Sequence, residues 1–275
     1  MPTLVTGATG FLGSAVVRAL LSEGETVRVL VRNNSNLSNI NNYPVEKVIG
    51  DLSDVNSLKL AVKGCNSLFH VAADYRLWVP DPEQMYNINV EGTRLLMSVA
   101  GEAGIKKIIY TSSVAVLGKG INGQSANEDS PVKIEDMIGH YKRSKFLAEA
   151  EVRRMIEEDG LSAIIVNPSA PVGICDIKPT PTGKIIVDFA NNKMPAYVDT
   201  GLNLVNVDDC AKGHLLAYEH GRVGQRYILG GENMKLKSIL DNLSMLSGQK
   251  APSIKLPHKL LMPVAHCSEA FGKIF

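Results

Sequence analysis

The sequence has few of the features that mark a disulfide-stabilised, membrane-spanning or nucleic-acid-binding protein. Its four cysteines, Cys65, Cys175, Cys210 and Cys267, are far apart and form no C-x-x-C pair, which favours reduced thiols over a disulfide or zinc framework. No apolar run is long enough to span a bilayer, and no cluster has metal-ligand spacing. With 29 Lys and Arg against 28 Asp and Glu, the chain lacks the basic excess of a nucleic-acid-binding protein. We therefore expect a cytoplasmic protein that binds neither metal nor nucleic acid.

Short β-branched runs alternate with amphipathic helical patterns along much of the 275-residue chain. This alternation predicts an α/β fold with a doubly wound parallel sheet, because right-handed connections place helices on both faces. The expected strands are Thr3–Thr6, Thr26–Val31, Val45–Ile49, Ser67–Val71, Lys107–Thr111 and Ala163–Val166, and the expected helices are Leu12–Ser22, Val55–Val62, Glu83–Ala100 and Asp136–Glu158.

The regular alternation of strand-like and helical segments ends after Val166, where prolines and glycines interrupt it. We predict a main domain over residues 1–168, to which residues 204–230 return through a helix at Asp208–His220 and a strand at Arg226–Leu229. Residues 169–203 and 231–275 are expected to form a smaller C-terminal lobe. We expect this lobe to be incomplete, because the sequence stops at Phe275 inside an apolar helical stretch.

Three glycines, Gly7, Gly10 and Gly13, follow the first predicted strand and open the first predicted helix. Glycines at such a turn permit the tight bend, the approach of backbone to a pyrophosphate and the close packing of helix on sheet. The spacing is G-x-x-G-x-x-G and not G-x-G-x-x-G, and the glycines could be purely structural. Their place between a strand and a helix favours a dinucleotide site. The candidate cofactor-binding residues of this loop are Gly7, Thr9, Gly10, Phe11, Leu12 and Gly13.

The end of the second predicted strand normally selects between NAD and NADP. It carries Arg32 where an acid would bind the ribose 2′-hydroxyl of NAD. Arg32 could hold the 2′-phosphate of NADP, or it could be a solvated surface residue, and we favour NADP(H) over NAD(H). Asp51, which precedes Leu52 after the third predicted strand, could accept a hydrogen bond from the adenine amino group or could cap the next helix.

Tyr141 and Lys145 lie one turn apart on one face of a predicted helix. A tyrosine pKa near ~10 is too high for a base at neutral pH, but a nearby ammonium and a cationic nicotinamide both favour the phenolate. Such a tyrosine can exchange a proton with a carbinol while hydride moves to or from the nicotinamide. Ser113 follows the strand Lys107–Thr111, where it could donate to the substrate oxygen or cap a turn. The glycine loop, this serine and the tyrosine–lysine pair, in that order, jointly predict a catalytic site.

These motifs resemble those of the extended short-chain dehydrogenases/reductases, and the resemblance covers nearly the whole chain. The segments that carry it are Thr6–Gly13, Gly50–Leu52, His70–Ala73, Asn89–Thr93, Thr111–Ser113, Tyr141–Lys145 and Val207–Asp209. Within the NAD-dependent epimerase/dehydratase family, the runs His70–Pro82 and Asp176–Gly183 are most similar to hopanoid-associated sugar epimerases, which are related to dihydroflavonol 4-reductases.

The resemblance implies a Rossmann-type domain that binds NAD(P). It implies that Ser113, Tyr141 and Lys145 form the catalytic set, that Val71, Ala72 and Ala73 line the cofactor, and that Pro168 and Val172 contact the nicotinamide. Tyr141 and Lys145 are also candidate cofactor-binding residues, because Lys145 can hold the ribose hydroxyls. Relatives also commonly pair the helices near Glu83–Ala100 and Asp136–Glu158 in a four-helix bundle, so we expect a homodimer. Asn167 departs from the family, in which arginine often precedes this proline, and that puts a contact by this side chain in doubt.

Substrate residues are expected after the fourth strand and in the smaller lobe. The candidates are Asp74, Tyr75, Arg76, Trp78, Lys178, Thr182 and Tyr197. Aromatic and charged groups suit a hydroxylated, partly planar ligand, although Tyr75 and Trp78 could equally pack in a lid. His70 is expected to be a structural histidine with satisfied hydrogen bonds. The smaller lobe has no obvious basic cluster, which favours a lipid- or phenol-linked substrate over a nucleotide sugar.

We predict an NAD(P)-dependent enzyme that moves hydride between the nicotinamide and a carbinol or carbonyl carbon, with Tyr141 as acid/base. The resemblance implies epimerisation of a sugar, such as one attached to a hopanoid lipid. A net NADPH-dependent ketone or aldehyde reductase of the dihydroflavonol 4-reductase type is the alternative, and both activities start from the same residues. A non-catalytic NADP-sensing protein is a further alternative, which would be expected to lose Tyr141 or Lys145.

Overall fold

Buried strands and amphipathic helices alternate in the computed structural model, which describes residues 1–120 and 124–257. Seven strands form one parallel sheet in the order β10-β6-β5-β4-β1-β2-β3, and the order reverses between β1 and β4. The elements of this domain are β1 (Thr3–Thr6), α1 (Phe11–Ser22), β2 (Val27–Val31), β3 (Glu46–Ile49), α2 (Val55–Val62), β4 (Ser67–His70), α3 (Glu83–Tyr86), α4 (Gly92–Glu102), β5 (Lys107–Thr111), α5 (His140–Asp159), β6 (Ala163–Pro168), α7 (Val207–His220) and β10 (Arg226–Leu229). The predicted doubly wound parallel sheet is confirmed.

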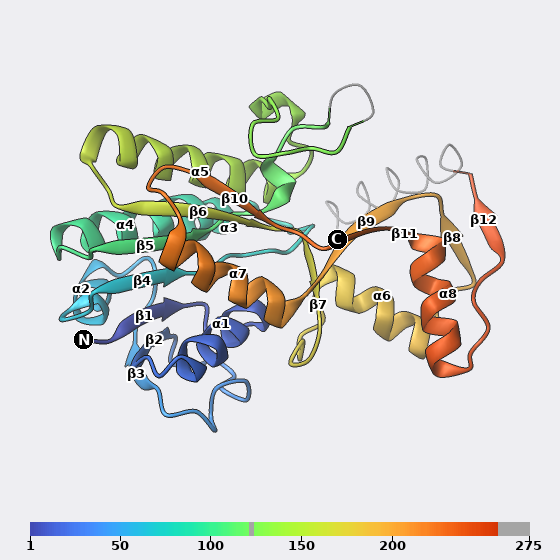
Figure 1. Cartoon of the computed structure of the whole chain (residues 1–275), viewed down its shortest axis with the longest axis horizontal. Coiled ribbons are helices and arrows are strands. Elements are labelled where there is room, and N and C mark those ends of the chain that lie inside the picture. The colour runs from blue at the N-terminus through green and yellow to red at the C-terminus, as the bar shows by residue number, and fades with distance from the viewer. Residues whose placement is uncertain (121–123, 258–275) are drawn as a thin grey trace.

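Helices cover both faces of this sheet (Figure 1). The neighbours Leu4 and Val5 of β1 are fully buried but belong to different cores, because successive strand residues point to opposite faces. The core around Leu4 includes side chains of α2, α4 and α5, and the core around Val5 includes side chains of α1 and α7. Strands buried on both faces explain the nearly continuous apolar runs in the sequence.

Two helices differ from the sequence prediction. The segment predicted as a helix from Asp136 to Glu158 contains a 3-10 turn, η3 (Ile134–Asp136), and α5 begins only at His140. Gly139 separates the two with a φ of +85°, which the right-handed helix does not allow. The segment predicted as a helix from Glu83 to Ala100 is divided by a π-helical turn, η1 (Asn87–Glu91).

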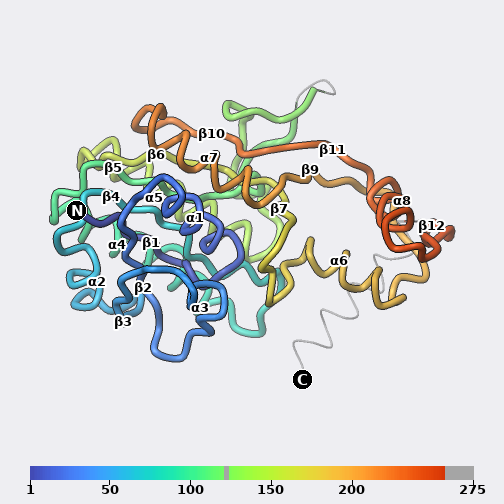
Figure 2. The backbone as a smooth tube through the Cα atoms, turned by 60° about the horizontal axis from the view of Figure 1, so that its bottom comes forward, coloured from blue at the N-terminus to red at the C-terminus, as the bar shows by residue number. Residues whose placement is uncertain are grey.

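A smaller lobe extends from the carboxyl edge of the sheet, because β6 leads directly into β7 (Figures 1 and 2). It contains the three-stranded sheet β11-β9-β7, the pair β12-β8 and two helices packed around Phe189, Leu236 and Leu240. Its elements are β7 (Ala170–Val172), α6 (Pro181–Ala190), β8 (Ala196–Val198), β9 (Gly201–Asn206), β11 (Glu232–Lys235), α8 (Leu236–Ser247) and β12 (Ile254–Leu256). The apolar stretch that ends at Phe275 lies outside the described residues. None of the helices within the described ranges is long and apolar enough to cross a membrane.

Candidate active site

The glycine loop forms a close-fitting cradle at the carboxyl end of β1. Gly7 has a φ of +73°, and a Cβ there would lie 2.6 Å from the backbone nitrogen of Ala72. A Cβ on Gly13 would lie 2.1 Å from the carbonyl oxygen of Gly7. Gly10 is the N-cap of α1 and supplies no capping side chain, which leaves the first-turn N–H groups of this helix to a ligand. This backbone cradle at a helix N-terminus fits a pyrophosphate.

The segments on either side hold the loop in place. The backbone nitrogens of Val71 and Ala72 donate to the carbonyl oxygen and the hydroxyl of Thr6, over 3.3 and 3.4 Å. On the other side, the Asn39 side chain donates to the carbonyl oxygens of Thr9 (3.2 Å) and Cys175 (3.1 Å). Asn39 thereby joins the glycine loop to the smaller lobe, and nothing in the sequence had singled it out.

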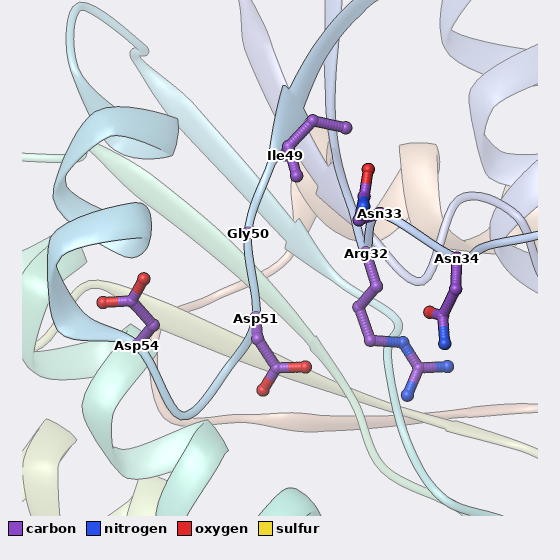
Figure 3. Close-up of a pocket in the computed structure, with 7 residues that line it drawn as sticks. All are labelled: Arg32, Asn33, Asn34, Ile49, Gly50, Asp51 and Asp54. Atoms are coloured by element: carbon purple, nitrogen blue, oxygen red, sulfur yellow. The ribbon is translucent and has the colours of Figure 1, made fainter.

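An open pocket of about 670 Å³ lies at the ends of β2 and β3. Figure 3 shows Arg32 and Asp51 on its wall, which also includes Asn33, Asn34, Ile49, Gly50 and Asp54. The backbone N–H and the hydroxyl of Ser53 donate to Asp51, over 3.0 and 2.7 Å. The backbone bond is the main cause that lowers the pKa of Asp51, and the Arg32 charge adds to it. Asp54, and not Asp51, caps α2, so the capping alternative for Asp51 is wrong.

The remaining predicted cofactor residues lie along the same edge of the sheet. Phe11 and Leu12 begin α1, Ala73 follows β4, Pro168 ends β6 and Val172 ends β7. Leu52 packs near α4, where a Cβ on Gly92 would lie 2.9 Å from the Leu52 Cβ. Two hydroxyls at this edge, Ser112 and Ser169, are buried without a hydrogen-bond partner among the described residues. A polar ligand at the strand ends would satisfy them.

Lys145 is buried beneath the catalytic edge. Its Nζ donates to the Thr111 carbonyl oxygen (2.8 Å) and to the Tyr110 hydroxyl (3.1 Å), and lies 4.7 Å from the centre of the Tyr110 ring. Burial lowers the pKa of Lys145 to about 8, and the Glu149 carboxylate opposes this shift. The lysine is therefore charged at neutral pH and titrates just above it.

Tyr141 precedes Lys145 by one turn of α5 and lies beside Ser113. Burial raises the pKa of Tyr141, and the Ser113 hydroxyl partly offsets the rise. Ser113 also accepts a hydrogen bond from the Ala115 nitrogen (3.1 Å), so it caps the 3-10 turn η2 (Val114–Val116) as well. The structure thus brings the three predicted catalytic residues to one place, with the tyrosine in its protonated form.

A buried network behind these residues was not predicted. The Asn167 side chain donates to the Ser113 carbonyl oxygen (3.0 Å) and to the Glu149 carboxylate (3.1 Å). Arg153 and Arg226 also donate to Glu149, each over 3.3 Å. Asn167 therefore makes a contact with the catalytic edge although it replaces the family's arginine. The spacing of Tyr141, Lys145 and Glu149 at four-residue intervals was the signal in the sequence that could have revealed Glu149.

Asn89, in the π-helical turn, fixes the loop that follows β4. Its side chain accepts from the Asp74 nitrogen (2.7 Å) and donates to the Asp74 carbonyl oxygen (2.9 Å) and the Ser144 hydroxyl (2.9 Å). π-Helical turns often occur at functional sites, because the extra residue redirects a side chain. Asn89 ties the candidate substrate loop to α5 between Tyr141 and Lys145.

His70 is the structural histidine that the sequence predicted. Its Nδ1 lies 2.7 Å from the Thr6 hydroxyl and its Nε2 lies 2.9 Å from the Thr93 hydroxyl. Burial lowers the pKa of His70 to about 3, with a contribution from Lys145, so the ring is neutral. Within the described residues, no three His, Cys, Asp or Glu side chains are grouped to hold a metal.

Six of the seven candidate substrate residues lie in or next to two neighbouring loops, and the seventh, Tyr197, does not. The Tyr75 hydroxyl lies 3.5 Å from the Lys178 carbonyl oxygen, so the loop after β4 meets the β7–α6 loop of the smaller lobe. Asp74 and Arg76 form an ion pair, Trp78 is exposed, and Thr182 lies in the first turn of α6. Tyr197, in β8, packs against the core of the smaller lobe and is the one candidate that the structure does not bring to these loops.

Comparison with known proteins agrees with this geometry. The NAD dependent epimerase/dehydratase family matches residues 3–230. The chain is 48% identical over 269 residues to a putative dihydroflavonol 4-reductase of Synechocystis sp., covering 96% of this chain and 78% of that protein. It is 38% identical over 277 residues to sterol demethylase protein B of Methylococcus capsulatus, covering 100% and 83%.

A solved structure shares the whole fold. The crystal structure of gox2253 is 57% identical in sequence and superposes with a TM-score of 0.92, covering 99% of this chain and 82% of that one. The chain therefore belongs to the NAD dependent epimerase/dehydratase family, within the extended short-chain dehydrogenases/reductases, and is an NAD(P)-dependent enzyme.

Proposed function

We propose that the enzyme moves hydride between NADP(H) and a carbinol or carbonyl carbon, with Tyr141 as acid/base and Ser113 and Lys145 as its partners. The observation that carries this proposal is the placement of Tyr141 beside Ser113, one turn from a buried Lys145 at the carboxyl edge of the sheet. Ligands of open parallel sheets bind at this edge.

In the direction of reduction, each group has a defined task. The bound cofactor supplies the hydride. The Tyr141 hydroxyl gives its proton to the substrate oxygen as charge develops there, and Ser113 stabilises the same oxygen by a hydrogen bond. The positive charge of Lys145 then favours the phenolate that remains. Oxidation runs through the same groups in reverse.

We propose net reduction or oxidation as the overall reaction, and not the hopanoid-linked sugar epimerisation that the sequence resemblance implied. Arg32 at the end of β2, in place of a carboxylate, supports this choice, because NADP(H) usually serves reduction. The relative named as a putative dihydroflavonol 4-reductase supports it as well. An epimerase would retain its cofactor through turnover and show no net redox change.

The catalytic assignment is tested with Tyr141→Phe. Androstenedione and dihydroquercetin serve as carbonyl substrates, with NADPH oxidation at 340 nm as the readout. We expect kcat/KM to fall by at least about 10²-fold, since the positioned acid is removed, while the variant still binds NADP. Tyr218→Phe is the matched control, because Tyr218 packs on Phe69 away from the site. Unchanged turnover in Tyr141→Phe would refute the assignment.

The same assay separates the two reactions. Stoichiometric NADPH consumption with a reduced product supports net reduction. Epimerised product without NADPH consumption, together with cofactor released from the purified protein on denaturation, would establish the epimerase instead. Proton transfer by Tyr141 would stand in both cases.

The preference for NADP(H) is part of the proposal and depends on Arg32. Arg32 lies on the wall of the pocket at the ends of β2 and β3, where no carboxylate follows β2 (Figure 3). We expect Arg32→Ala to weaken NADPH binding by about 10–100-fold in isothermal titration, because a charge-assisted hydrogen bond is lost. NADH binding should not change, and Asn34→Ala is the control from the same pocket. Equal losses for both cofactors would overturn the preference.

We also propose that the enzyme is a cytoplasmic homodimer paired through α4 and α5. These helices pack against each other over one core of the sheet (Figure 1). Leu147 is an exposed apolar residue on α5. Leu147→Glu should shift the mass measured by light scattering from dimer to monomer, and a monomeric wild type would contradict the proposal.

A further inference from the structure

Two short loops carry an unusual share of the exposed apolar surface. The loop after β4 exposes Tyr75 (39%), Leu77 (65%) and Trp78 (49%), and the β7–α6 loop exposes Ile174 (65%) and Ile177 (55%). They supply five of the sixteen large exposed hydrophobic side chains among the described residues. Exposed apolar residues without a function are normally scattered singly over a protein surface. Their concentration in two loops beside the candidate active site therefore indicates an apolar ligand.

The two loops meet and are fastened beside the catalytic helix. The Tyr75 hydroxyl lies 3.5 Å from the carbonyl oxygen of Lys178, which joins the loops. Asn89 ties the first loop to α5 through Asp74 and Ser144. The exposed side chains therefore belong to segments held next to the turn of α5 between Tyr141 and Lys145.

The charges of these loops do not suit a nucleoside diphosphate. Asp74 and Asp176 balance Arg76 and Lys178, so the two segments have no net charge. The Arg76 guanidinium is engaged by the Asp74 carboxylate, with its Nε 2.9 Å from Oδ1. A pyrophosphate would find no excess of positive charge here.

The N-terminus of α6, another place in the smaller lobe where a phosphate could bind, is occupied by the protein's own carboxylate. Asp176 accepts from the Thr180 nitrogen (2.9 Å) and hydroxyl (2.8 Å), and Thr180 in turn caps α6 by accepting from the Gly183 nitrogen (3.0 Å). A Cβ on Gly183 would lie only 2.0 Å from Asp176 Oδ2, so the carboxylate is packed into the first turn. Pro181 offers no N–H at this turn. An incoming phosphate would be repelled where a helix N-terminus would otherwise attract it.

Resting on the proposed function, we infer that the substrate is an uncharged ring compound with apolar faces, held between residues 74–78 and 174–178. A nucleoside diphosphate sugar is not the substrate. The rings pack against Leu77, Trp78 and Ile177, and the carbonyl or carbinol group reaches Tyr141.

Trp78 makes this inference directly measurable, because it is the only tryptophan in the chain. The protein is saturated with NADP⁺ and titrated with androstenedione, an uncharged tetracyclic ketone, or with UDP-glucose, while tryptophan emission is recorded. We expect a saturable change in emission with the steroid and none with UDP-glucose at tenfold higher concentration.

Two variants place the binding site on both loops. Leu77→Ser and Ile177→Ser should each weaken steroid binding about tenfold or more, since each removes an apolar side chain that the ligand would bury. Leu246→Ser is the matched control, because Leu246 is 86% exposed on α8 in the smaller lobe. Variant affinities equal to that of Leu246→Ser would overturn the inference, as would UDP-glucose binding that displaces the steroid.

These experiments test the substrate class and the catalytic role of Tyr141 separately. Tyr141→Phe should still bind the steroid and quench or shift Trp78 emission as the wild type does. Steroid binding with unchanged turnover in Tyr141→Phe would refute the proposed acid/base and leave the substrate class standing. UDP-glucose binding with turnover lost in Tyr141→Phe would do the reverse.

Discussion

Glu149 is expected to set the charge of the catalytic lysine, and Glu149→Gln removes that influence while keeping a side chain that can bind Asn167. The two residues are one turn apart on α5, which places their β-carbons about 5–6 Å apart. Two unit charges about 6 Å apart interact by about 3 kcal/mol at an effective dielectric constant of about 20, which corresponds to about two pKa units. Arg153 and Arg226 share the carboxylate and reduce its effect. We therefore expect the pKa of Lys145 to fall by about one to two units.

A carboxylate favours the charged form of a neighbouring ammonium, so its loss moves the pKa of Lys145 from about 8 to between about 6 and 7. At pH 7.5 the lysine would then be mostly neutral and would no longer stabilise the Tyr141 phenolate. The falling limb of kcat against pH should begin near pH 8 in the wild type and about one to two units lower in the variant.

Two measurements check this expectation. The first is kcat against pH from 5.5 to 9.5 with a substrate established by the NADPH assay. The second is a titration of Lys145 followed by NMR of ¹³C-labelled lysine, which needs no substrate. Glu157→Gln is the control, because Glu157 is an exposed carboxylate on the same helix. If Glu149→Gln lowered kcat equally at every pH and left the lysine titration unmoved, the reasoning would be wrong, and Glu149 would serve only the stability of the fold.

Three further expectations concern the loop and the core. Gly13→Ala should abolish NADP binding in isothermal titration, because its Cβ would lie 2.1 Å from the Gly7 carbonyl oxygen, and full affinity would contradict the described cradle. Asn39→Ala removes the two hydrogen bonds that join the glycine loop at Thr9 to the smaller lobe at Cys175, and it should weaken NADPH binding about 10-fold or more at roughly 1 kcal/mol per bond. Unchanged NADPH affinity would show that the loop keeps its shape without Asn39. His70 and His214 are buried and neutral, with pKa values of about 3 and about 4. Because the unfolded chain binds protons below about pH 6.5, stability should fall by about 2 kcal/mol per histidine between pH 7 and pH 5, and a constant urea midpoint would exclude this linkage.

Much of the fold could be predicted because its strands are buried on both faces and separated by regular helices. The predicted ranges Thr3–Thr6, Val55–Val62 and Lys107–Thr111 agree with the structure to the residue. The start of α5 could not be placed, because Ile134 and Ile138 continue an apolar pattern through a segment that is not α-helical. Ile138 is in fact 83% exposed, and the backbone of Gly139 decides where the helix begins. Hydrophobic spacing cannot reveal a positive φ.

In the candidate site, too, features that are local in the sequence could be predicted and tertiary contacts could not. Gly7 and Gly13 could be identified from their spacing within one short segment, as could Tyr141 and Lys145, and a single sequence displays that spacing. The residues that hold them in place are distant in the sequence. Asn39 contacts the glycine loop from 30 residues away, and Asn167 contacts Ser113 from 54 residues away. Such contacts exist only once the strands have assembled, which is why the sequence indicated the candidate catalytic residues and not the groups that hold them.

The resting charges of the ligand-free site match the state from which carbonyl reduction would start. Tyr141 has a raised pKa and keeps its proton, because burial outweighs the help it receives from Ser113. Oxidation of a carbinol needs a phenolate, which this environment disfavours until a cationic nicotinamide is present. Reduction of a carbonyl needs a phenol, which is already in place at neutral pH, and a charged Lys145 to stabilise the phenolate that forms. The protein is therefore prepared for reduction before any ligand binds, and this agrees with a cofactor pocket that presents Arg32 and no carboxylate at the end of β2.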